Sequence, residues 1–270
     1  MKPAPFDYHA ADSVAHALGL LQRLGDEARI LAGGQSLGPM LNFRSARPSH
    51  LVDISRIAAL KSIAARADGS IRLGACVTHA QIEDASLQSL PRDAGRYLRH
   101  VAQGIAYRAI RTRGTLAGSV ANADPAADWP VALAAMEARI ELSGPAGLRT
   151  ASIAECVVGV FETVIAPGEM ISAIEIPGPG STAFGWGYRK ETRKTGEFAR
   201  ALAACVHRGG PVAQVWLGAM QGRPIAIGVA IGTRDAMYAR IHAGLTTVSD
   251  AYERHLHALT AANAIVDAIG

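Results

Sequence analysis

The sequence has few aromatic residues and few cysteines. Aromatic residues make up 5% of the 270 residues although hydrophobic residues make up 49%, so the apolar content is mainly aliphatic and excludes a disordered or fibrous chain. Cys76, Cys156 and Cys205 stand far apart without a CxxC pair, which argues against a disulfide framework. Any iron–sulfur cluster or structural zinc site therefore belongs to another chain. The odd cysteine count fits a reducing, cytoplasmic location.

Long hydrophobic runs and a strong charge of one sign are also missing. Residues 1–8 contain no apolar core of signal-peptide length, and no apolar run in the sequence is long enough to span a bilayer, so we expect no membrane span. Lys and Arg total 27 against 23 for Asp and Glu, and the densest basic stretch, residues 189–194, is interrupted by Glu191. The net charge of +4 is too dispersed to indicate a nucleic-acid partner.

Hydrolytic motifs are absent as well. The nine histidines are dispersed, and the sequence contains neither HExxH nor GxSxG. Asp124 and Asp128 are better explained by helix capping and ligand contacts than by paired acid–base catalysis. If the chain belongs to an enzyme, a cofactor must therefore carry the chemistry.

Helix and strand signals are regular along the chain. Apolar residues at helical spacing lie between Ser13 and Gly25, which predicts an amphipathic helix. Asp68-Gly69 is typical of a β-hairpin, and Thr78 with Gln81 has the capping-box spacing of a short helix. The other predicted strands cover residues 29–32, 51–54, 139–142, 170–176, 183–190, 198–206, 212–220 and 223–229, and the other predicted helices cover 37–41, 91–102, 125–136, 235–243 and 250–268.

This order of elements predicts an α+β (mixed α/β) fold of three packed units. We place the units at residues 1–58, 59–177 and 178–270. The Pro- and Gly-rich segment 177–180 marks the second boundary. The last unit is predicted as a strand meander with a helical tail, whose final helix is expected to bury Leu256, Leu259 and Val266.

Two segments could bind a ligand, and the first of them is residues 31–37. Gly33 and Gly34 lack a Cβ, so several backbone N–H groups can converge on a phosphate oxygen, and Ser36 can add a hydroxyl donor. The segment is neither a Walker A motif nor GxGxxG. A plain tight turn is the alternative, and these residues alone leave both interpretations open.

The second segment, residues 114–130, combines small residues, hydroxyls, an amide and two carboxylates. Thr115 and Ser119 can donate to phosphate, and Asp128 can accept from ribose hydroxyls. A compatible alternative is that Asp124 caps a helix whose first residue is the proline that follows it. Together the two segments suggest a diphosphate bridged between the first two units, without identifying the nucleotide.

The sequence matches one known family in several segments. These are Lys2-Pro3, Phe6-Asp7-Tyr8, 30–37, 51–54, 73–75 with Thr78-His79, 111–130, 174–177 and 193–199. They resemble the FAD-binding, medium subunit of molybdenum hydroxylases of the xanthine dehydrogenase and carbon monoxide dehydrogenase type. The resemblance covers essentially the whole chain, and residues 114–130 are its most specific part.

The resemblance implies a fold and a set of cofactor contacts. The fold is a two-subdomain FAD-binding domain of the vanillyl-alcohol-oxidase or PCMH type, followed by a small C-terminal α/β domain with an antiparallel sheet and helices. Asp128 would contact the ribose or ribityl side of FAD, and Lys190 with Ile171 would lie near the flavin. The full set of implied FAD contacts is Ala32, Gly33, Gly34, Gln35, Ser36, Leu37, His79, Thr115, Leu116, Ala117, Gly118, Ser119, Asn122, Asp128, Ile171 and Lys190.

The sequence departs from the family pattern at two positions. The family usually has two glycines where this chain has Ala117-Gly118, and it usually has Asp where Glu197 stands. A methyl group at residue 117 could crowd the diphosphate and weaken FAD retention.

The function implied by the resemblance is electron transfer. Substrate is hydroxylated at a molybdenum–pterin cofactor in a large subunit, electrons pass through 2Fe-2S clusters in a small subunit, and FAD in this chain delivers them to an external acceptor. The implied assembly is a heterotrimer or its dimer. The alternatives are a self-sufficient flavoenzyme with the same FAD-binding fold and a non-enzymatic scaffold that has lost its cofactor.

Overall fold

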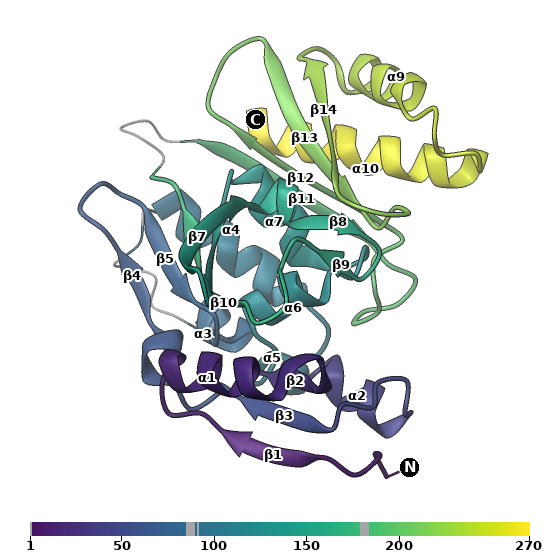
Figure 1. Cartoon of the computed structure of the whole chain (residues 1–270). Coiled ribbons are helices and arrows are strands. Elements are labelled where there is room, and N and C mark those ends of the chain that lie inside the picture. Colours follow the sequence, from purple (N-terminus) through teal and green to yellow (C-terminus); the bar gives the residue numbers. More distant parts are fainter. Residues whose placement is uncertain (1, 85–89, 91, 179–183) are drawn as a thin grey trace.

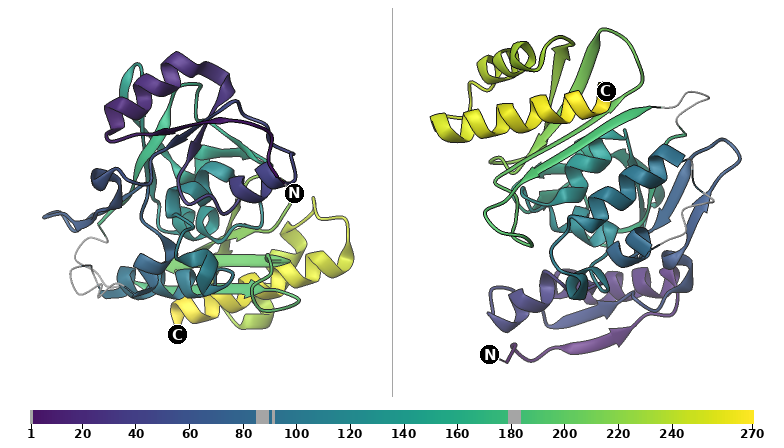
Figure 2. Two further views of the ribbon diagram at one scale, coloured as in Figure 1. Left: turned by 90° about the horizontal axis from the view of Figure 1, so that it is seen from below. Right: turned by 180° about the vertical axis from the view of Figure 1, so that it is seen from behind.

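The computed structural model of the chain describes residues 2–84, 90, 92–178 and 184–270. Its strands form three larger sheets and one two-stranded sheet, and the three larger sheets follow one another through the molecule in sequence order (Figure 1). Helices from the middle of the chain lie between the N-terminal and C-terminal sheets (Figure 2). This is the mixed α/β architecture that the sequence predicts. None of the helices in these ranges is both long enough and apolar enough to cross a membrane.

The N-terminal sheet is parallel, with strand order β1-β3-β2. Its elements are β1 (Asp7–Ala10), α1 (Val14–Leu24), a 3-10 turn (Gly25–Glu27), β2 (Ala28–Leu31), α2 (Leu37–Asn42) and β3 (His50–Asp53). The Ser13 side chain caps α1 by accepting a hydrogen bond from the His16 N–H, and the helix ends at Gly25, where φ is +59°. The predicted first helix is therefore confirmed with both of its end signals.

The middle sheet is antiparallel, with strand order β4-β5-β10-β6-β7. Gly69, at a φ of +81°, closes the β4–β5 hairpin, and Thr78 and Gln81 bond each other's backbone N–H at the start of α3, as predicted. The elements of this unit are a 3-10 helix (Ala58–Lys61), β4 (Ile63–Ala65), β5 (Ile71–Gly74), α3 (His79–Asp84), α4 (Arg92–Gln103), α5 (Arg108–Arg111), α6 (Leu116–Asn122), α7 (Asp128–Ala135), β6 (Arg139–Gly144), β7 (Gly147–Ser152), α8 (Ile153–Cys156), β8 (Val157–Gly159), β9 (Glu162–Thr163) and β10 (Met170–Ile176).

Residues 114–136 differ from the prediction. Two separate helices, α6 and α7, are joined by a short connection, and α7 begins at Asp128. The Asp124 carboxylate accepts a hydrogen bond from the Ala126 N–H at 2.9 Å and so stabilises a turn within that connection. The prediction that Asp124 caps a helix beginning at Pro125 is wrong, because the Asp124 side chain closes this turn before α7 starts.

The C-terminal sheet is an antiparallel meander in sequence order. Its elements are β11 (Gly185–Glu191), β12 (Ala201–His207), β13 (Val212–Gly218), β14 (Ile225–Ala230), α9 (Arg234–Gly244) and α10 (Ala251–Ile269). One face of the sheet is covered by α10, and the other lies against α4 and α7 of the middle unit (Figure 2). Alternate residues of β12 accordingly belong to two hydrophobic cores: Leu202 and Ala204 to the larger one, Ala203 and Cys205 to the C-terminal one.

Helix α10 lies unusually close to β11. A Cβ at Gly185 would lie 1.8 Å from the Ala268 carbonyl oxygen, and one at Gly187 would lie 1.9 Å from that of Ala264. The expected buried stripe is wrong, since Val266 is 37% exposed and Leu256 and Leu259 are only partly buried. Because the helix approaches so closely, small residues fill the buried stripe instead, mainly Ala258, Ala261, Ala262, Ala264 and Ala268.

Candidate cofactor site between the two glycine segments

The two predicted ligand-binding segments meet in space. We call residues 32–36 the first glycine segment and residues 113–119 the second. A Cβ on Gly33 would lie 2.1 Å from the Arg113 carbonyl oxygen and 2.9 Å from the Gly114 Cα, so the two main chains are in direct contact. Any larger residue at Gly33 would force the N-terminal and middle units apart. The expectation that these two segments lie together is confirmed.

The first glycine segment offers several unpaired backbone donors. Gln35 Nε2 donates to the Gly33 carbonyl at 3.1 Å, and Gly34 has a φ of +72°, so the segment is a tight turn with a fixed shape. Its carbonyls are used, since the Gly38 N–H donates to Gly34 and the Met40 N–H to Ser36. The amide N–H groups of residues 32–36, by contrast, find no acceptor in the described part of the chain. They are available to an anion.

A hollow of about 400 Å³ opens between the N-terminal and middle units beside this contact. It is lined by Ala32, Gly33, Ser55, Lys61, Cys76, Thr78, Gln81, Thr112, Arg113 and Thr115. Two of these residues, Lys61 and Arg113, are exposed cations whose side chains form no ion pair with any described residue. The hollow therefore combines unpaired N–H donors with uncompensated positive charge, and this suits a phosphate-bearing ligand.

The second glycine segment forms the start of α6. The buried Thr115 hydroxyl accepts a hydrogen bond from the Gly118 N–H at 3.1 Å, and a Cβ at Gly118 would lie 2.6 Å from that hydroxyl. Ala117 is 3% exposed and packs within the large hydrophobic core. Its methyl group is covered by protein and does not open onto the hollow, so the expected crowding of a diphosphate by residue 117 is not supported. Ser119 and Asn122 are half-buried.

His79, the first residue of α3, lies directly behind the second glycine segment. Its Nδ1 accepts a hydrogen bond from the Trp129 indole N–H at 3.0 Å, and a Cβ at Gly114 would lie 2.8 Å from its Nε2. Burial of the ring lowers the pKa of His79 to about 4. The side chain is therefore neutral near neutral pH and packs against Gly114, so it supports the second glycine segment from the protein side.

Asp128 and Lys190 are predicted cofactor contacts, and the structure brings them into contact with each other. Lys190 Nζ lies 2.8 Å from Asp128 Oδ1 and also donates to the Gly104 carbonyl, while the Tyr188 hydroxyl donates to the same carboxylate oxygen at 2.5 Å. Burial, followed by the negative charge of Asp128, holds the pKa of Tyr188 well above its usual value. Neither member of the pair lines the hollow, and neither does Ile171, which is buried in the core on β10.

The connection between α6 and α7 is held from two other parts of the chain. The Phe161 N–H in the β8–β9 hairpin donates to the Ala123 carbonyl at 2.9 Å, and the Ala219 N–H after β13 donates to the Pro125 carbonyl at 2.8 Å. Ala123, Phe161 and Ala219 all have positive φ, at 47°, 56° and 58°. Non-glycine residues adopt this conformation only where their surroundings enforce it. The C-terminal sheet thus helps to fix the connection that leads into Asp128.

Several residues of this region were not predicted. Lys61 and Arg113 line the hollow, and Arg113 directly precedes Gly114, so a cation next to a glycine turn was the available signal. Trp129 and Tyr188 bond His79 and Asp128 respectively from positions far away in the sequence. No local pattern marks such long-range partners.

Comparison with known proteins defines the class. The family model for the FAD binding domain in molybdopterin dehydrogenase matches residues 4–179. The chain belongs to the FAD-binding medium subunits of molybdenum hydroxylases, an oxidoreductase family. It is 42% identical over 212 residues to the 6-hydroxypseudooxynicotine dehydrogenase complex subunit alpha of Paenarthrobacter nicotinovorans, covering 76% of this chain and 68% of that protein. It is 42% identical over 209 residues to the carbon monoxide dehydrogenase medium chain of Afipia carboxidovorans, covering 76% and 70%.

Solved structures of similar proteins superpose on this chain over its full length. Carbon monoxide dehydrogenase from Hydrogenophaga pseudoflava superposes with a TM-score of 0.90 at 30% identity, covering 100% of this chain and 99% of that chain. Quinoline 2-oxidoreductase from Pseudomonas putida 86 gives 0.86 at 30% identity, covering 99% and 98%. The resemblance, fold class and FAD-dependent electron-transfer class predicted from the sequence are confirmed, and a self-sufficient flavoenzyme is not favoured.

Proposed function

We propose that this chain binds FAD with the diphosphate between its two glycine segments, and that it passes electrons from a molybdenum hydroxylase to an external acceptor. The observation that carries the proposal is the main-chain contact at Gly33, next to the unpaired amides of residues 32–36 and the cations Lys61 and Arg113. A diphosphate needs several N–H donors and positive charge at close range, so these residues fit FAD. Bound flavin supplies the redox chemistry.

Roles for the predicted contact residues follow from this arrangement. Main-chain N–H groups of the first glycine segment hold the diphosphate, and the Ser36 and Ser119 hydroxyls add donors. Asp128, Lys190 and Ile171 belong to the ribityl and flavin part of the site, where the Lys190 ammonium donates to the Asp128 carboxylate and fixes its orientation. The remaining proposed contacts are Ala32, Gly33, Gly34, Gln35, Leu37, Thr115, Leu116, Gly118 and Asn122, together with His79 and Ala117, whose buried side chains lie on the protein side of the second segment.

The proposed partners are a small iron–sulfur subunit and a large molybdenum subunit, in a cytoplasmic heterotrimer or its dimer. The names of the relatives, a complex subunit and medium chains, support a multi-subunit assembly. We further propose domain limits at residues 1–58, 59–177 and 178–270, since each range contains one of the three larger sheets. Within such an assembly the residues of this chain bind and orient the flavin, and the hydroxylation takes place elsewhere.

A matched pair of glycine variants tests the FAD site. Gly33→Val places a branched side chain where even a Cβ meets the Arg113 carbonyl, so this variant is expected to retain little flavin after purification. Gly38→Ala in α2 has no heavy atom within 4 Å of the added Cβ and is expected to retain flavin as the wild type does. Circular dichroism confirms that each variant is folded, and released FAD per chain is measured. A folded Gly33→Val protein with stoichiometric FAD would contradict the proposed site.

Purification of the chain from its native cells tests the assembly. We expect FAD on this chain together with two co-purifying polypeptides, one containing iron and one containing molybdenum. Flavin on an isolated chain that turns over a substrate alone would overturn the electron-transfer proposal. A chain isolated without flavin, and unable to take up added FAD, would support the scaffold alternative.

A further inference from the structure

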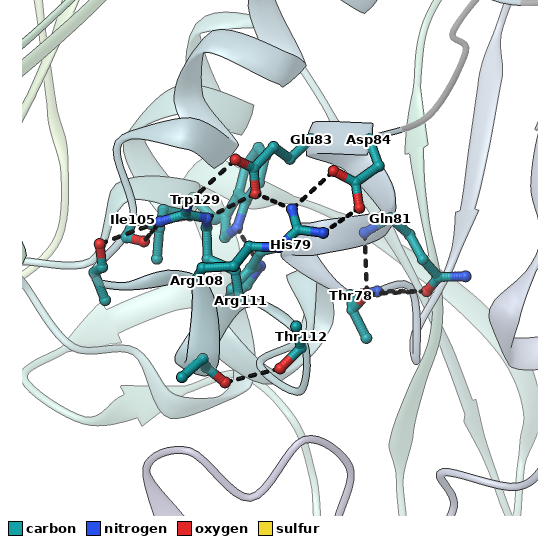
Figure 3. Close-up of polar contacts among 12 residues, drawn as sticks. Thr78, His79, Gln81, Glu83, Asp84, Ile105, Arg108, Arg111, Thr112 and Trp129 are labelled. Carbon is teal, nitrogen blue, oxygen red and sulfur yellow. Dashed lines mark hydrogen bonds and ion pairs between the residues drawn. The ribbon is translucent and has the colours of Figure 1, made fainter.

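An ion-pair cluster joins α3 to α5 behind the second glycine segment (Figure 3). Glu83 accepts hydrogen bonds from Arg111 Nε at 2.8 Å and Nη2 at 3.1 Å, and from Arg108 Nη1 at 2.6 Å. Among the residues that the structure describes, its neighbour Asp84 accepts hydrogen bonds from Arg108. Two adjacent carboxylates therefore share one arginine, and only Glu83 reaches the second.

The two ends of the cluster differ in burial. The Glu83 and Arg111 side chains are 15% and 12% exposed, whereas those of Asp84 and Arg108 are 57% and 48% exposed. The hydrogen bonds from Arg111, the largest influence, and then those from Arg108 hold the pKa of Glu83 below its usual value. The pair between Glu83 and Arg111 is thus a shielded, charge-assisted contact, while the Asp84 contact is exposed and contributes little.

Arg111 also fixes the turn that precedes α5. Its Nη1 donates to the Ile105 carbonyl at 2.9 Å and to the Ala106 carbonyl at 3.2 Å. Ala106 has a φ of 41°, so this turn is held in a conformation that an alanine rarely adopts. The guanidinium of Arg111 therefore connects α3, this turn and α5 at a single point.

Main-chain hydrogen bonds fix the second glycine segment relative to α5. The Arg113 and Gly114 N–H groups donate to the Ile110 carbonyl at 3.1 and 2.8 Å, and the Thr112 N–H donates to the Arg108 carbonyl. Residues 112–114 thus continue the hydrogen bonding of α5. The Arg113 carbonyl is the atom that Gly33 contacts across the site, so a shift of α5 changes the separation of the two glycine segments.

We propose that Glu83 is a positioning residue for FAD, which acts through Arg111 to set the separation of the two glycine segments. The inference rests on the proposed function, since it assumes that FAD binds between those segments. Glu83 itself does not line the hollow. A purely structural ion pair would stabilise the fold equally with and without cofactor, whereas a positioning pair changes the affinity of the folded protein for FAD.

The adjacent carboxylates provide a matched test in the full chain. Glu83→Gln is expected to raise the dissociation constant for FAD of the refolded apoprotein at least tenfold, equivalent to about 1.4 kcal/mol. Asp84→Asn, which loses only the exposed contact, is expected to stay within about twofold of the wild type. Flavin fluorescence gives the affinity, and hydrogen exchange of the apoprotein is expected to show faster exchange at residues 112–114 in Glu83→Gln only.

The outcomes separate this inference from the proposed function. If the wild type binds FAD and Gly33→Val does not, but Glu83→Gln binds as tightly as Asp84→Asn, then the positioning role is wrong and the site stands. If Gly33→Val keeps FAD, the proposed site itself fails. If Glu83→Gln does not fold, Arg111→Lys replaces it, since lysine keeps the positive charge but loses the paired contact with Glu83. Wild-type FAD affinity in that variant would also overturn the inference.

Discussion

Trp129 determines the chemical state of His79. The indole N–H can only donate, and it lies 3.0 Å from Nδ1 of the buried imidazole, so Nδ1 must be the unprotonated, accepting nitrogen. The ring hydrogen is then on Nε2, the atom nearest to Gly114. A protonated His79 would lose this bond and place a charge in the core. The second glycine segment therefore rests on an imidazole that has to stay neutral.

The first prediction concerns acid stability. Because the pKa of His79 is about 4 in the folded chain and near 6.5 when unfolded, the unfolded chain binds the extra proton between these values. The contribution of His79 is complete above pH 6.5 and is lost as the pH falls towards 4, by up to about 3 kcal/mol. His79→Asn keeps an acceptor for Trp129 without titrating. Urea unfolding at pH 7.5 and pH 5 is expected to show a smaller pH dependence in the variant.

His257 provides the internal control for this measurement. Burial also lowers its pKa, so part of the pH dependence of the wild type comes from the C-terminal core. That part remains in His79→Asn and cancels in the comparison. Equal loss of stability on acidification in both proteins would show that His79 is not held neutral.

The second prediction concerns the buried pair between Asp128 and Lys190. Lys190→Met leaves the Asp128 carboxylate buried with only the Tyr188 hydroxyl as a side-chain partner, and it is expected to destabilise the apoprotein by about 3 kcal/mol. Adding Asp128→Asn to this variant removes the uncompensated charge and is expected to restore part of the lost free energy of unfolding. Urea unfolding of the wild type, both single variants and the double variant gives the coupling energy. Additive effects would mean that the two side chains do not interact.

The third prediction concerns the family's usual glycine at residue 117. Ala117→Gly removes a methyl group from the core and places a glycine inside α6, so it is expected to lower the free energy of unfolding by about 1 kcal/mol. It is not expected to tighten FAD binding, since the methyl group is covered by protein. Thermal unfolding and FAD titration measure the two effects. A clear gain in affinity would show that the methyl group crowds the cofactor after all.

The fourth prediction concerns the close approach of α10 to the sheet. Gly187→Ala places a Cβ 1.9 Å from the Ala264 carbonyl, so the helix must shift, and we expect a loss of about 2 kcal/mol. Gly19→Ala inside α1 has no atom within 4 Å of the new Cβ and is expected to raise stability by about 0.5–1 kcal/mol. Thermal unfolding of both variants checks the contrast. An unchanged midpoint in Gly187→Ala would contradict the described packing.

Local sequence patterns predict much of the fold. Ser13 and Gly25 predict both ends of α1, Asp68-Gly69 predicts a hairpin, and Thr78 with Gln81 predicts the start of α3, because in each case the interacting groups are a few residues apart. The four strand segments after residue 180 also predict the meander that the structure contains. The two glycine segments could be paired as one site because both are rich in residues that allow close approach of a ligand.

Contacts between distant residues could not be predicted from the sequence alone. Helical spacing predicts that Leu256 is buried in α10, but the glycines of β11 bring the helix so close that alanines fill the contact. Asp124 had the composition of a helix cap, and its local bond to Ala126 closes a turn instead. Whether a methyl group or a carboxylate faces ligand, core or solvent depends on partners that are far apart in the sequence.

The hydrogen bond from Ala219 to the Pro125 carbonyl has a consequence for cooperativity. This bond joins the C-terminal unit to the connection ahead of α7, the Asp128–Lys190 pair joins it to the first residue of α7, and β12 contributes to two cores at once. The C-terminal sheet is therefore not an independent appendage, and it should melt in the same calorimetric transition as the middle unit. FAD bound in the hollow would then raise the melting temperature of strands that do not touch it.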